Sequence, residues 1–235
     1  SGPRGVGKTS TARILTKAIN CTNLQDSMEP CNQCNSCLGV IENSSPDVFE
    51  IDAASNRGIE NIRELRENIK YSPANHRYKV YIIDEAHMLT LESFNALLKT
   101  LEEPPSHIKF ILATTDPHKI PQTILSRCQR YDFLRIPLQK SADFLEQVAL
   151  KEKIGISRSA LEMIAQSATG GMRDALTALD QVRSYAGETA SNEQVAQVLG
   201  MMHSGSRFAL LEAILKKDAQ TALEVFYELQ QYGQD

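Results

Sequence analysis

The 235-residue sequence contains no apolar run long enough to span a bilayer, and its start lacks the character of a signal peptide. These two absences predict a cytoplasmic protein with no membrane contact. An excess of basic residues is also missing, since the formal net charge is −4. A chain of this charge does not coat nucleic acid by bulk electrostatics, so any nucleic-acid contact must be local or shared with partners.

Internal repeats and low-complexity tracts are absent as well. Hydrophobic residues make up 42% of the chain, which is ordinary for a folded protein with a sizeable core. This length accommodates one large domain or two smaller ones.

A glycine-rich segment at the start predicts a phosphate-binding loop. It fits the pattern G-x-x-x-x-G-K-[ST], in which small residues let backbone N–H groups face phosphate oxygens ahead of a helix. Lys8 is expected to neutralise the β- and γ-phosphates, and Thr9 to ligate Mg²⁺. The expected nucleotide-binding residues here are Gly2, Pro3, Arg4, Gly5, Val6, Gly7, Lys8, Thr9 and Ser10. Such a loop normally follows a buried strand, so we expect this chain to be a fragment with weakened nucleotide affinity.

A second block is the apolar run of residues 80–83, which ends in Asp84 and Glu85. It predicts a buried strand that delivers two carboxylates at its C-terminal edge. Asp84 is expected to hold the magnesium ion, and Glu85 to polarise the water that attacks the γ-phosphate. Together the two blocks predict a nucleotide triphosphatase.

Strands alternate with helices in the first half of the chain. We expect strands at residues 47–52, 79–84, 109–114 and 131–135, and helices at 10–20, 59–69 and 91–101. This alternation predicts an α/β fold, with a parallel sheet covered by helices on both faces. Beyond Pro137 only helices are expected, at 141–153, 157–167, 172–185, 192–199, 207–215 and 219–231, with a domain boundary near residues 136–139.

Four cysteines form a tight cluster in the sequence: Cys21, Cys31, Cys34 and Cys37. Their spacing, C-x9-C-x2-C-x2-C, suits a tetrahedral zinc site that leaves no coordination position open for catalysis. We therefore predict structural zinc. Disulfides are disfavoured by an intracellular setting and an odd fifth cysteine, and an iron–sulfur cluster is a further alternative.

Three further residues carry two interpretations each. Thr115 follows an expected strand and either reaches the γ-phosphate or its water, or caps a turn. Arg127 either pairs with an acid on its own surface or acts as an arginine finger at a neighbouring subunit's nucleotide. Arg173, at the start of a helix, either forms a local salt bridge or cap, or contacts nucleotide from the helical half. We interpret His87 as a hydrogen-bonded structural residue and leave it out of the site.

Read together, these motifs resemble the ATPase (gamma/tau) subunits of the bacterial DNA polymerase III clamp loader, in the AAA+ superfamily. The match covers the whole chain, and its most discriminating marks are the cysteine insertion and the triplet Ser126, Arg127 and Cys128. Further marks are the phosphate loop, residues 84–87, residues 113–117 and residues 171–176.

The resemblance implies a role for each candidate. Thr115 takes the sensor-1 position, Arg127 the trans-acting finger, Arg173 the sensor-2 position, and the cysteines a zinc module at 21–37. It also implies three domains: an AAA+ nucleotide-binding domain at 1–137, a three-helix lid at 138–201, and the start of a helical collar at 202–235.

The activity implied by the resemblance is mechanical. With ATP, Mg²⁺ and Zn²⁺ as cofactors, the chain would act in a hetero-pentameric ring with other clamp-loader subunits. ATP binding would let the ring open the sliding clamp and grip primer–template DNA, and hydrolysis would release both.

Three rival functions stay open on the sequence alone. One is a helicase-type AAA+ motor on branched DNA, for which the cysteine module is unexpected. Another is a structural ring subunit with little hydrolysis, which the intact Lys8, Thr9, Asp84 and Glu85 argue against. The third is a zinc-dependent interaction module with a vestigial phosphate loop.

Overall fold

The computed structural model describes residues 1–56, 58–200 and 204–231. Its contacts divide the chain into two compact units, one of residues Ser1–Leu134 and one that starts at Arg135. This division lies close to the boundary expected at residue 137. Among the described residues, no helix is both long enough and apolar enough to cross a membrane.

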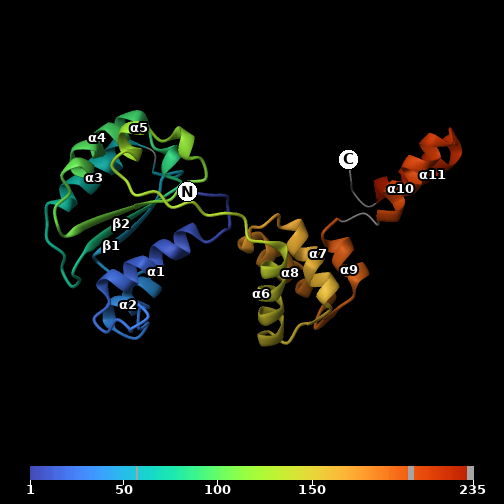
Figure 1. Ribbon diagram of the computed structural model, residues 1–235, viewed down its shortest axis with the longest axis horizontal. Coiled ribbons are helices and arrows are strands. Elements are labelled where there is room, and N and C mark those ends of the chain that lie inside the picture. The colour runs from blue at the N-terminus through green and yellow to red at the C-terminus, as the bar shows by residue number, and fades with distance from the viewer. Residues whose placement is uncertain (57, 201–203, 232–235) are drawn as a thin grey trace. The chain divides into compact units, whose positions relative to one another are not determined.

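The first unit is built on a three-stranded parallel sheet in the order β1-β2-β3 (Figure 1). The strands are β1 (Val48–Asp52), β2 (Lys79–Asp84) and β3 (Ile108–Leu112). Asp52 is the register partner of Asp84, and Ile83 that of Leu112. The carboxyl ends of all three strands therefore meet at one edge, which is where an open parallel sheet binds its ligands.

Strand β2 is buried on both faces, as a central strand in a parallel sheet must be. Its side chains alternate between two separate cores. Tyr81 and Ile83 join the larger core with helices α3 (Ile59–Ile69) and α4 (Leu91–Glu102), whereas Val80 and Ile82 pack with Ala12 of α1 (Lys8–Asn20). The continuous apolar run that predicted this strand thus reflects burial on two sides.

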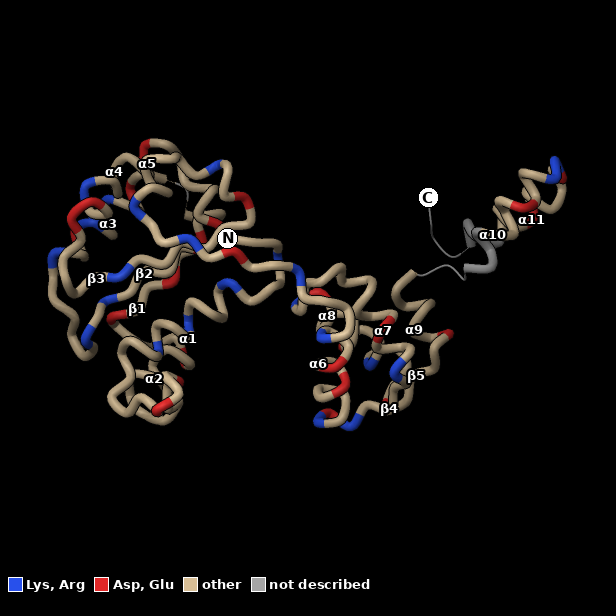
Figure 2. Tube along the Cα trace, in the orientation of Figure 1, with Lys and Arg blue, Asp and Glu red and all other residues tan. Residues whose placement is uncertain are grey.

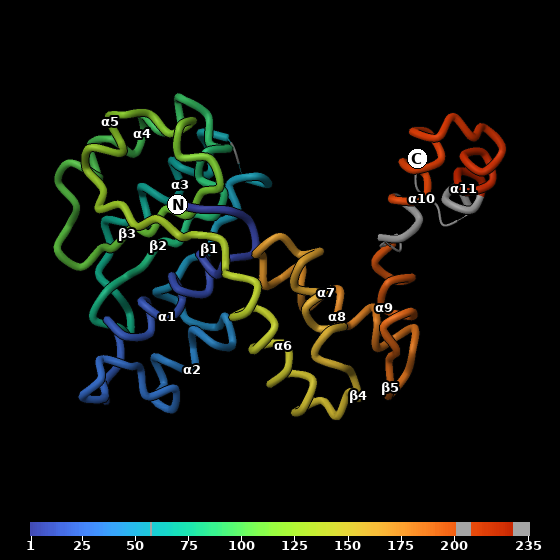
Figure 3. Tube along the Cα trace, turned by 45° about the vertical axis from the view of Figure 1, so that its right-hand side comes forward, coloured from blue at the N-terminus to red at the C-terminus, as the bar shows by residue number. Residues whose placement is uncertain are grey.

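Helices cover both faces of the sheet. Helices α3 and α4 lie on one face, while α1 and α2 (Asn35–Ile41) lie on the other and stay side by side in both views (Figures 1 and 3). Helix α2 was not expected from the sequence. The remaining short elements of this unit are η1 (Ala86–Met88), η2 (Pro117–Lys119) and α5 (Gln122–Leu125).

The side chain of Asn20 anchors the end of α1 to the sheet. Its amide oxygen accepts from the backbone N–H of Tyr78 at 2.9 Å, and its amide nitrogen donates to the carbonyl of Tyr78 at 3.1 Å. This reciprocal pair, buried to 4% exposure, fixes where the cysteine segment leaves the helix.

The expected strand at residues 131–135 is wrong, because this segment is extended but forms no ladder. Its neighbours are the first residues of the chain. The Ser1 ammonium donates to the Tyr131 carbonyl, and Phe133 N–H donates to the Ser1 carbonyl at 2.7 Å. Gly2 N–H donates to Thr114 at 3.1 Å, so Ser1 and Gly2 lie between the end of β3 and the extended segment. One paired residue is too few to define a strand.

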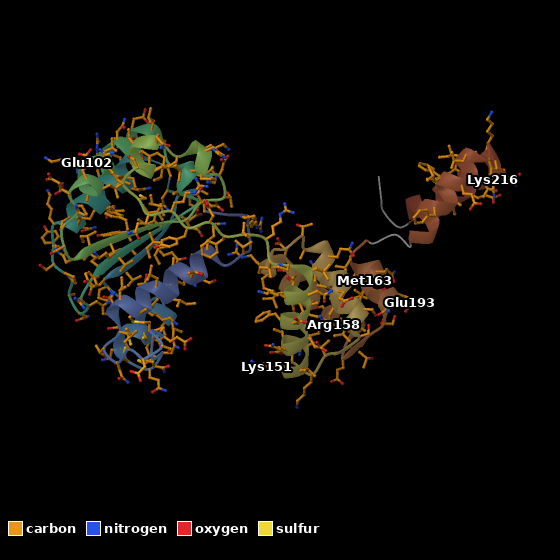
Figure 4. All side chains as sticks on the ribbon, viewed as in Figure 1. Glu102, Lys151, Arg158, Met163, Glu193 and Lys216 are labelled. Atoms are coloured by element: carbon orange, nitrogen blue, oxygen red, sulfur yellow. The ribbon has the colours of Figure 1, made fainter. Side chains whose placement is uncertain are left out.

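The second unit begins with four helices around one core: α6 (Leu138–Lys151), α7 (Arg158–Ser167), α8 (Met172–Ala186) and α9 (Asn192–Val198). Their apolar faces supply the Leu, Ile, Val and Ala side chains of that core. On the surface, Arg158, labelled in Figure 4, forms ion pairs with Asp143 and Glu146 of α6 and with Glu162 of its own helix. This confirms the expected helical domain.

The expectation of no strand after Pro137 is wrong in one detail. A two-residue parallel pair, β4 (Gly155–Ile156) and β5 (Thr189–Ala190), links the loops before α7 and α9. Strands this short carry no periodic pattern in the sequence, which is why they were missed.

The last helices, α10 (Ser204–Leu215) and α11 (Ala219–Gln231), pack against each other. They lie in the segment expected to begin a collar, of which residues 202–203 and 232–235 fall outside the described residues, as does residue 201 at the expected end of the lid. Lys and Arg residues are interspersed with Asp and Glu over both units (Figure 2). The division into lid and collar stays a prediction.

Candidate nucleotide site

The glycines of the phosphate loop have backbone conformations that other residues rarely adopt. Gly7, which precedes α1, has a φ of 96°. Gly2 has a φ of 151°, and a Cβ placed on it would lie 2.3 Å from the carbonyl oxygen of Phe133. A side chain at either position would strain or displace the loop.

The start of α1 suits an anion. No side chain caps this helix, and no acidic residue lies in its first turn. Its first N–H groups therefore face outward with the positive end of the helix dipole, as they do where a helix binds phosphate.

The ammonium of Lys8 lies over the same loop. Its Nζ donates to the carbonyl oxygens of Gly2 and Pro3, each at 2.8 Å. These two bonds fold the side chain back across the loop, so the positive charge lies at its first residues.

The hydroxyl of Thr9 reaches across to the sheet. Its Oγ1 donates to Asp84 Oδ2 at 2.6 Å, although the two residues are 75 positions apart. The second oxygen of Asp84 accepts from the backbone N–H of Glu85 at 2.8 Å, which orients the carboxylate. The two expected magnesium ligands thus lie side by side, and oxygen ligands are what Mg²⁺ prefers.

Glu85 lies at the end of β2 in the left-handed region, with φ 47° and ψ 43°. This conformation costs on the order of 1 kcal/mol for a residue with a side chain, and such strain clusters at functional sites. The strained backbone aims the carboxylate at β3: Glu85 Oε2 accepts from Thr115 Oγ1 at 2.9 Å and from Thr115 N–H at 3.3 Å. The structure therefore brings Glu85 and Thr115 together.

His87, which the sequence interpretation left out of the site as a hydrogen-bonded structural residue, also lies in this cluster. Its Nδ1 lies 3.0 Å from Thr114 Oγ1 and 3.4 Å from Glu85 Oε2. The contact with Thr114 depends on the close approach of β2 and β3. A histidine three residues after Asp84 gave no local signal for it.

Arg127 pairs with an acid of its own chain. Its guanidinium donates to Glu102 of α4, which is labelled in Figure 4, and to the Thr123 carbonyl at 2.6 Å. The arginine side chain is 34% exposed, so the pair lies at the surface. Arg173 is exposed in the first turn of α8, in the second unit. Arg4 and Ser10 are exposed at the phosphate loop.

The four expected zinc ligands converge in the cysteine segment. Their Sγ atoms all lie within 4.8 Å of one another, and the cysteines are free rather than disulfide-bonded. Backbone N–H groups support the sulfurs, with Cys31 N donating to Cys21 Sγ at 3.4 Å and Cys34 N to Cys31 Sγ at 3.3 Å. This is the donor set and closed arrangement that structural zinc takes.

The surroundings of the cluster shift the pKa values of Cys34 and Cys37 in opposite directions. Burial opposes ionisation of Cys34, but hydrogen bonds from the backbone of Thr22 and Cys37 outweigh it and lower the pKa of Cys34 to about 5. Burial raises the pKa of Cys37 to about 12. Four thiolates this close repel one another, and a divalent cation removes that repulsion.

Comparisons with known proteins bear on both units. Residues 1–137, more than half of the chain, match the family described as "DNA polymerase III, delta subunit". Residues 142–188 match "DNA polymerase III clamp loader subunit, ATPase lid domain".

Two curated relatives cover almost the whole chain. It is 49% identical over 235 residues to DNA polymerase III subunit tau of Bacillus subtilis, and covers 42% of that protein. It is 42% identical to the tau subunit of Escherichia coli over 97% of the chain and 35% of that protein. The chain thus spans less than half the length of these relatives.

Among solved structures, the chain is similar to the Holliday junction branch migration motor RuvB of Thermotoga maritima. The TM-score is 0.60 at 16% identity, over 91% of this chain and 66% of that one. At this identity the likeness concerns the fold alone, and it confirms the expected α/β fold.

Proposed function

The chain belongs to the family of DNA polymerase III clamp-loader subunits, and from that premise we propose that it is the ATP-hydrolysing motor part of such a subunit. In this proposal, ATP binding and hydrolysis are coupled to loading of the sliding clamp on primed DNA. The observation that carries it is the hydrogen bond of 2.6 Å between Thr9 and Asp84, which joins the phosphate loop to the acidic edge of the sheet.

Each residue of the site has a separate task. The backbone N–H groups of residues 2–9 and the start of α1 bind the phosphates, while Lys8 balances their charge by exchanging its contacts with Gly2 and Pro3 for phosphate oxygens. Thr9 and Asp84 hold Mg²⁺, which when bound neutralises charge on the triphosphate.

Glu85 is proposed to act as the general base. It orients and polarises the attacking water, and Thr115 holds its carboxylate at 2.9 Å. With 32% of its side chain exposed, Glu85 is open to water from the site. Arg4 and Ser10 flank the phosphates from the loop, and Arg173 contacts the nucleotide from the lid. These assignments rest on the sequence motifs together with the geometry around Asp84.

The cysteine cluster is proposed to hold structural zinc. Cys21, Cys31, Cys34 and Cys37 would fill all four coordination positions of the zinc and leave none open for catalysis. Its task is to fix the segment between α1 and α2, which the Asn20 anchor joins to β2.

Other clamp-loader subunits are the proposed partners, in a hetero-pentameric ring that binds the sliding clamp and primer–template DNA. Arg127 is the proposed finger for the neighbouring subunit's ATP. To serve there, its guanidinium must leave Glu102 for phosphate oxygens, which accept the same planar set of donors. A surface ion pair contributes about 1 kcal/mol or less, so breaking it costs little free energy.

Arg127→Ala tests the finger in mixed assemblies that contain one altered subunit. Hydrolysis should slow at the adjacent subunit's site while ATP binding by the altered subunit stays normal, because the arginine acts in trans. Slowed turnover confined to the altered subunit's own site would refute this assignment.

A helicase-type motor on branched DNA is the second candidate, since the fold is shared with a branch migration motor. ATP turnover by the full-length protein decides between the two. It should rise when clamp and primed DNA are both present, and should not respond to a four-way junction without the clamp. Stimulation by the junction alone would favour the rival.

A further inference from the structure

The imidazole of His87 lies between the ends of β2 and β3, next to the proposed general base. Its Nδ1 is 3.0 Å from Thr114 Oγ1 and 3.4 Å from Glu85 Oε2. The His87 side chain is 10% exposed, and Thr114 is 3% exposed, so solvent does not easily replace either contact. A single ring nitrogen thus faces two oxygen atoms.

The chemistry of these two oxygens determines which ring nitrogen carries the hydrogen. An ionised carboxylate only accepts hydrogen bonds, so a bare Nδ1 lone pair this close to Glu85 Oε2 would repel it. A hydrogen on Nδ1 is attracted to both Glu85 and Thr114. Thr114 Oγ1 also accepts from the N–H of Asp116 at 3.0 Å, and an oxygen with two lone pairs can take both donors.

The same carboxylate oxygen has two other donors. Thr115 supplies its hydroxyl at 2.9 Å and its N–H at 3.3 Å, both to Oε2 of Glu85. With His87 added, three donors converge on one oxygen from two residues on different strand ends. Such an arrangement fixes the rotation of the carboxyl group and turns Oε1 away from the anchor.

We propose that His87 is a positioning residue for Glu85. Its Nδ1–H is shared between Thr114 and Glu85, and so fastens the base to the end of β3. This inference rests on the proposed function, since it assigns Glu85 the role of general base. Fixing the base before ATP arrives removes part of the cost of orienting it in the transition state.

The proposal separates catalysis from binding. His87 touches neither the phosphate loop nor the two magnesium ligands in the contacts recorded for the described residues, so its loss should leave ATP affinity unchanged. A residue that only packs at the strand end would instead lower stability and change the two kinetic constants together, or neither.

The kinetic test uses the full-length protein with two substitutions. Asparagine places an amide N–H near the position of Nδ1, whereas alanine removes the donor. We expect His87→Ala to lower kcat by roughly tenfold with KM for ATP unchanged, and His87→Asn to restore most of kcat. His107→Ala is the control, because that partly buried histidine faces the Ile69 carbonyl at 3.4 Å and not the site. Normal kcat in His87→Ala, or equal losses in the Ala and Asn variants, would overturn the proposal.

A second measurement tests the hydrogen bonding of His87 without measuring turnover. Histidine-selective ¹⁵N labelling of the full-length wild-type protein reports which nitrogen is protonated in the neutral ring, and His87→Asn assigns the signal. We expect the Nδ1–H form of His87, and the Nε2–H form would overturn the inference. Absence of any ATP turnover in the wild-type protein would instead count against the proposed function alone, because the tautomer does not depend on it.

Discussion

The nucleotide site, formed by the phosphate loop and by Asp84 and Glu85 at the carboxyl edge of the sheet, is called the phosphate edge below. The phosphate edge and the cysteine cluster both bring ligand atoms together, but different parts of the chain hold those atoms in place. Thr9 and Asp84 meet across 75 positions, and only because α1 packs on a buried β2. The four cysteines meet within residues 21–37, on one loop and the start of α2. The first site therefore depends on the whole unit, whereas the second depends on its own loop and on the metal.

This difference implies that the two sites fail separately. Damage to the phosphate edge should remove nucleotide chemistry while the fold and the cysteine cluster persist. Removal of the metal should loosen the cluster while the phosphate edge persists, because the Asn20 anchor stands between them. Three substitutions test this separation and a fourth tests stability alone, and they follow in order of expected effect.

Lys8→Ala should have the largest effect. The ammonium is the proposed counter-charge for the β- and γ-phosphates, so its loss should abolish measurable ATP binding and lower turnover by about 100-fold or more. Titration calorimetry with ATP measures the first quantity, and metal analysis of the same sample should find zinc unchanged. Retained ATP affinity would contradict the assignment of this segment as a phosphate-binding loop.

Glu85→Gln should follow, with turnover lowered by roughly 10²- to 10⁴-fold, because the amide cannot take a proton from water. ATP binding should persist, since the Glu85 carboxylate contacts Thr115 and His87 rather than the phosphate loop. Nucleotide affinity measured beside turnover separates the two effects. Ordinary turnover in this variant would contradict the role of the carboxylate.

Cys34→Ser removes one of the four sulfurs and should release the zinc, whose binding in small structural sites is worth about 10–16 kcal/mol. ATP turnover should stay within about twofold, since effects at distant sites are nearly independent. Metal content by mass spectrometry and turnover are measured on one preparation. A variant that keeps its metal yet loses turnover would show that the two regions are not separable.

Tyr81→Phe should have the smallest effect, and on stability alone. The hydroxyl of Tyr81 is buried with no hydrogen-bond partner among the described residues, while its ring stacks on Phe49 and Phe110 with centroids 4.9 and 5.5 Å away. Deleting this oxygen should raise the free energy of unfolding by about 1 kcal/mol. Denaturant unfolding measures the change, and Tyr71→Phe, at an exposed tyrosine, is the control. A clear loss of stability would mean that the hydroxyl has a partner.

The pKa of the same tyrosine also reflects its burial. Burial, together with the charge of Asp47, raises the pKa of Tyr81 to about 12. The phenol therefore stays neutral in the fold over the ordinary pH range, and its only polar atom adds a cost without a matching bond.

Much of the phosphate edge could be predicted from the sequence. The loop pattern and the apolar run before Asp84 each reflect a local physical demand, and parallel strands bring their carboxyl ends to one edge whatever the rest of the chain does. The helices of the second unit were predictable for a similar reason, since each buries one face at helical spacing.

Other features could not be predicted, because they depend on neighbours distant in sequence. His87 meets Thr114 only where β2 and β3 align. The segment at 131–135 has the composition of a strand, but Ser1 is its only recorded backbone partner within the first unit as described. For Arg127 the sequence left two interpretations open, and the surface pair with Glu102 fits the first of them.

The central claim is that the phosphate loop and the acidic edge of the sheet form one magnesium–nucleotide site. The most direct measurement is the ATP affinity of the full-length protein with and without Mg²⁺, for the wild type and for Asp84→Asn. We predict that Mg²⁺ tightens ATP binding by the wild type and does so far less in the variant, because the variant lacks the carboxylate charge that would hold the metal beside Thr9. An equal gain from Mg²⁺ in both proteins would contradict the account.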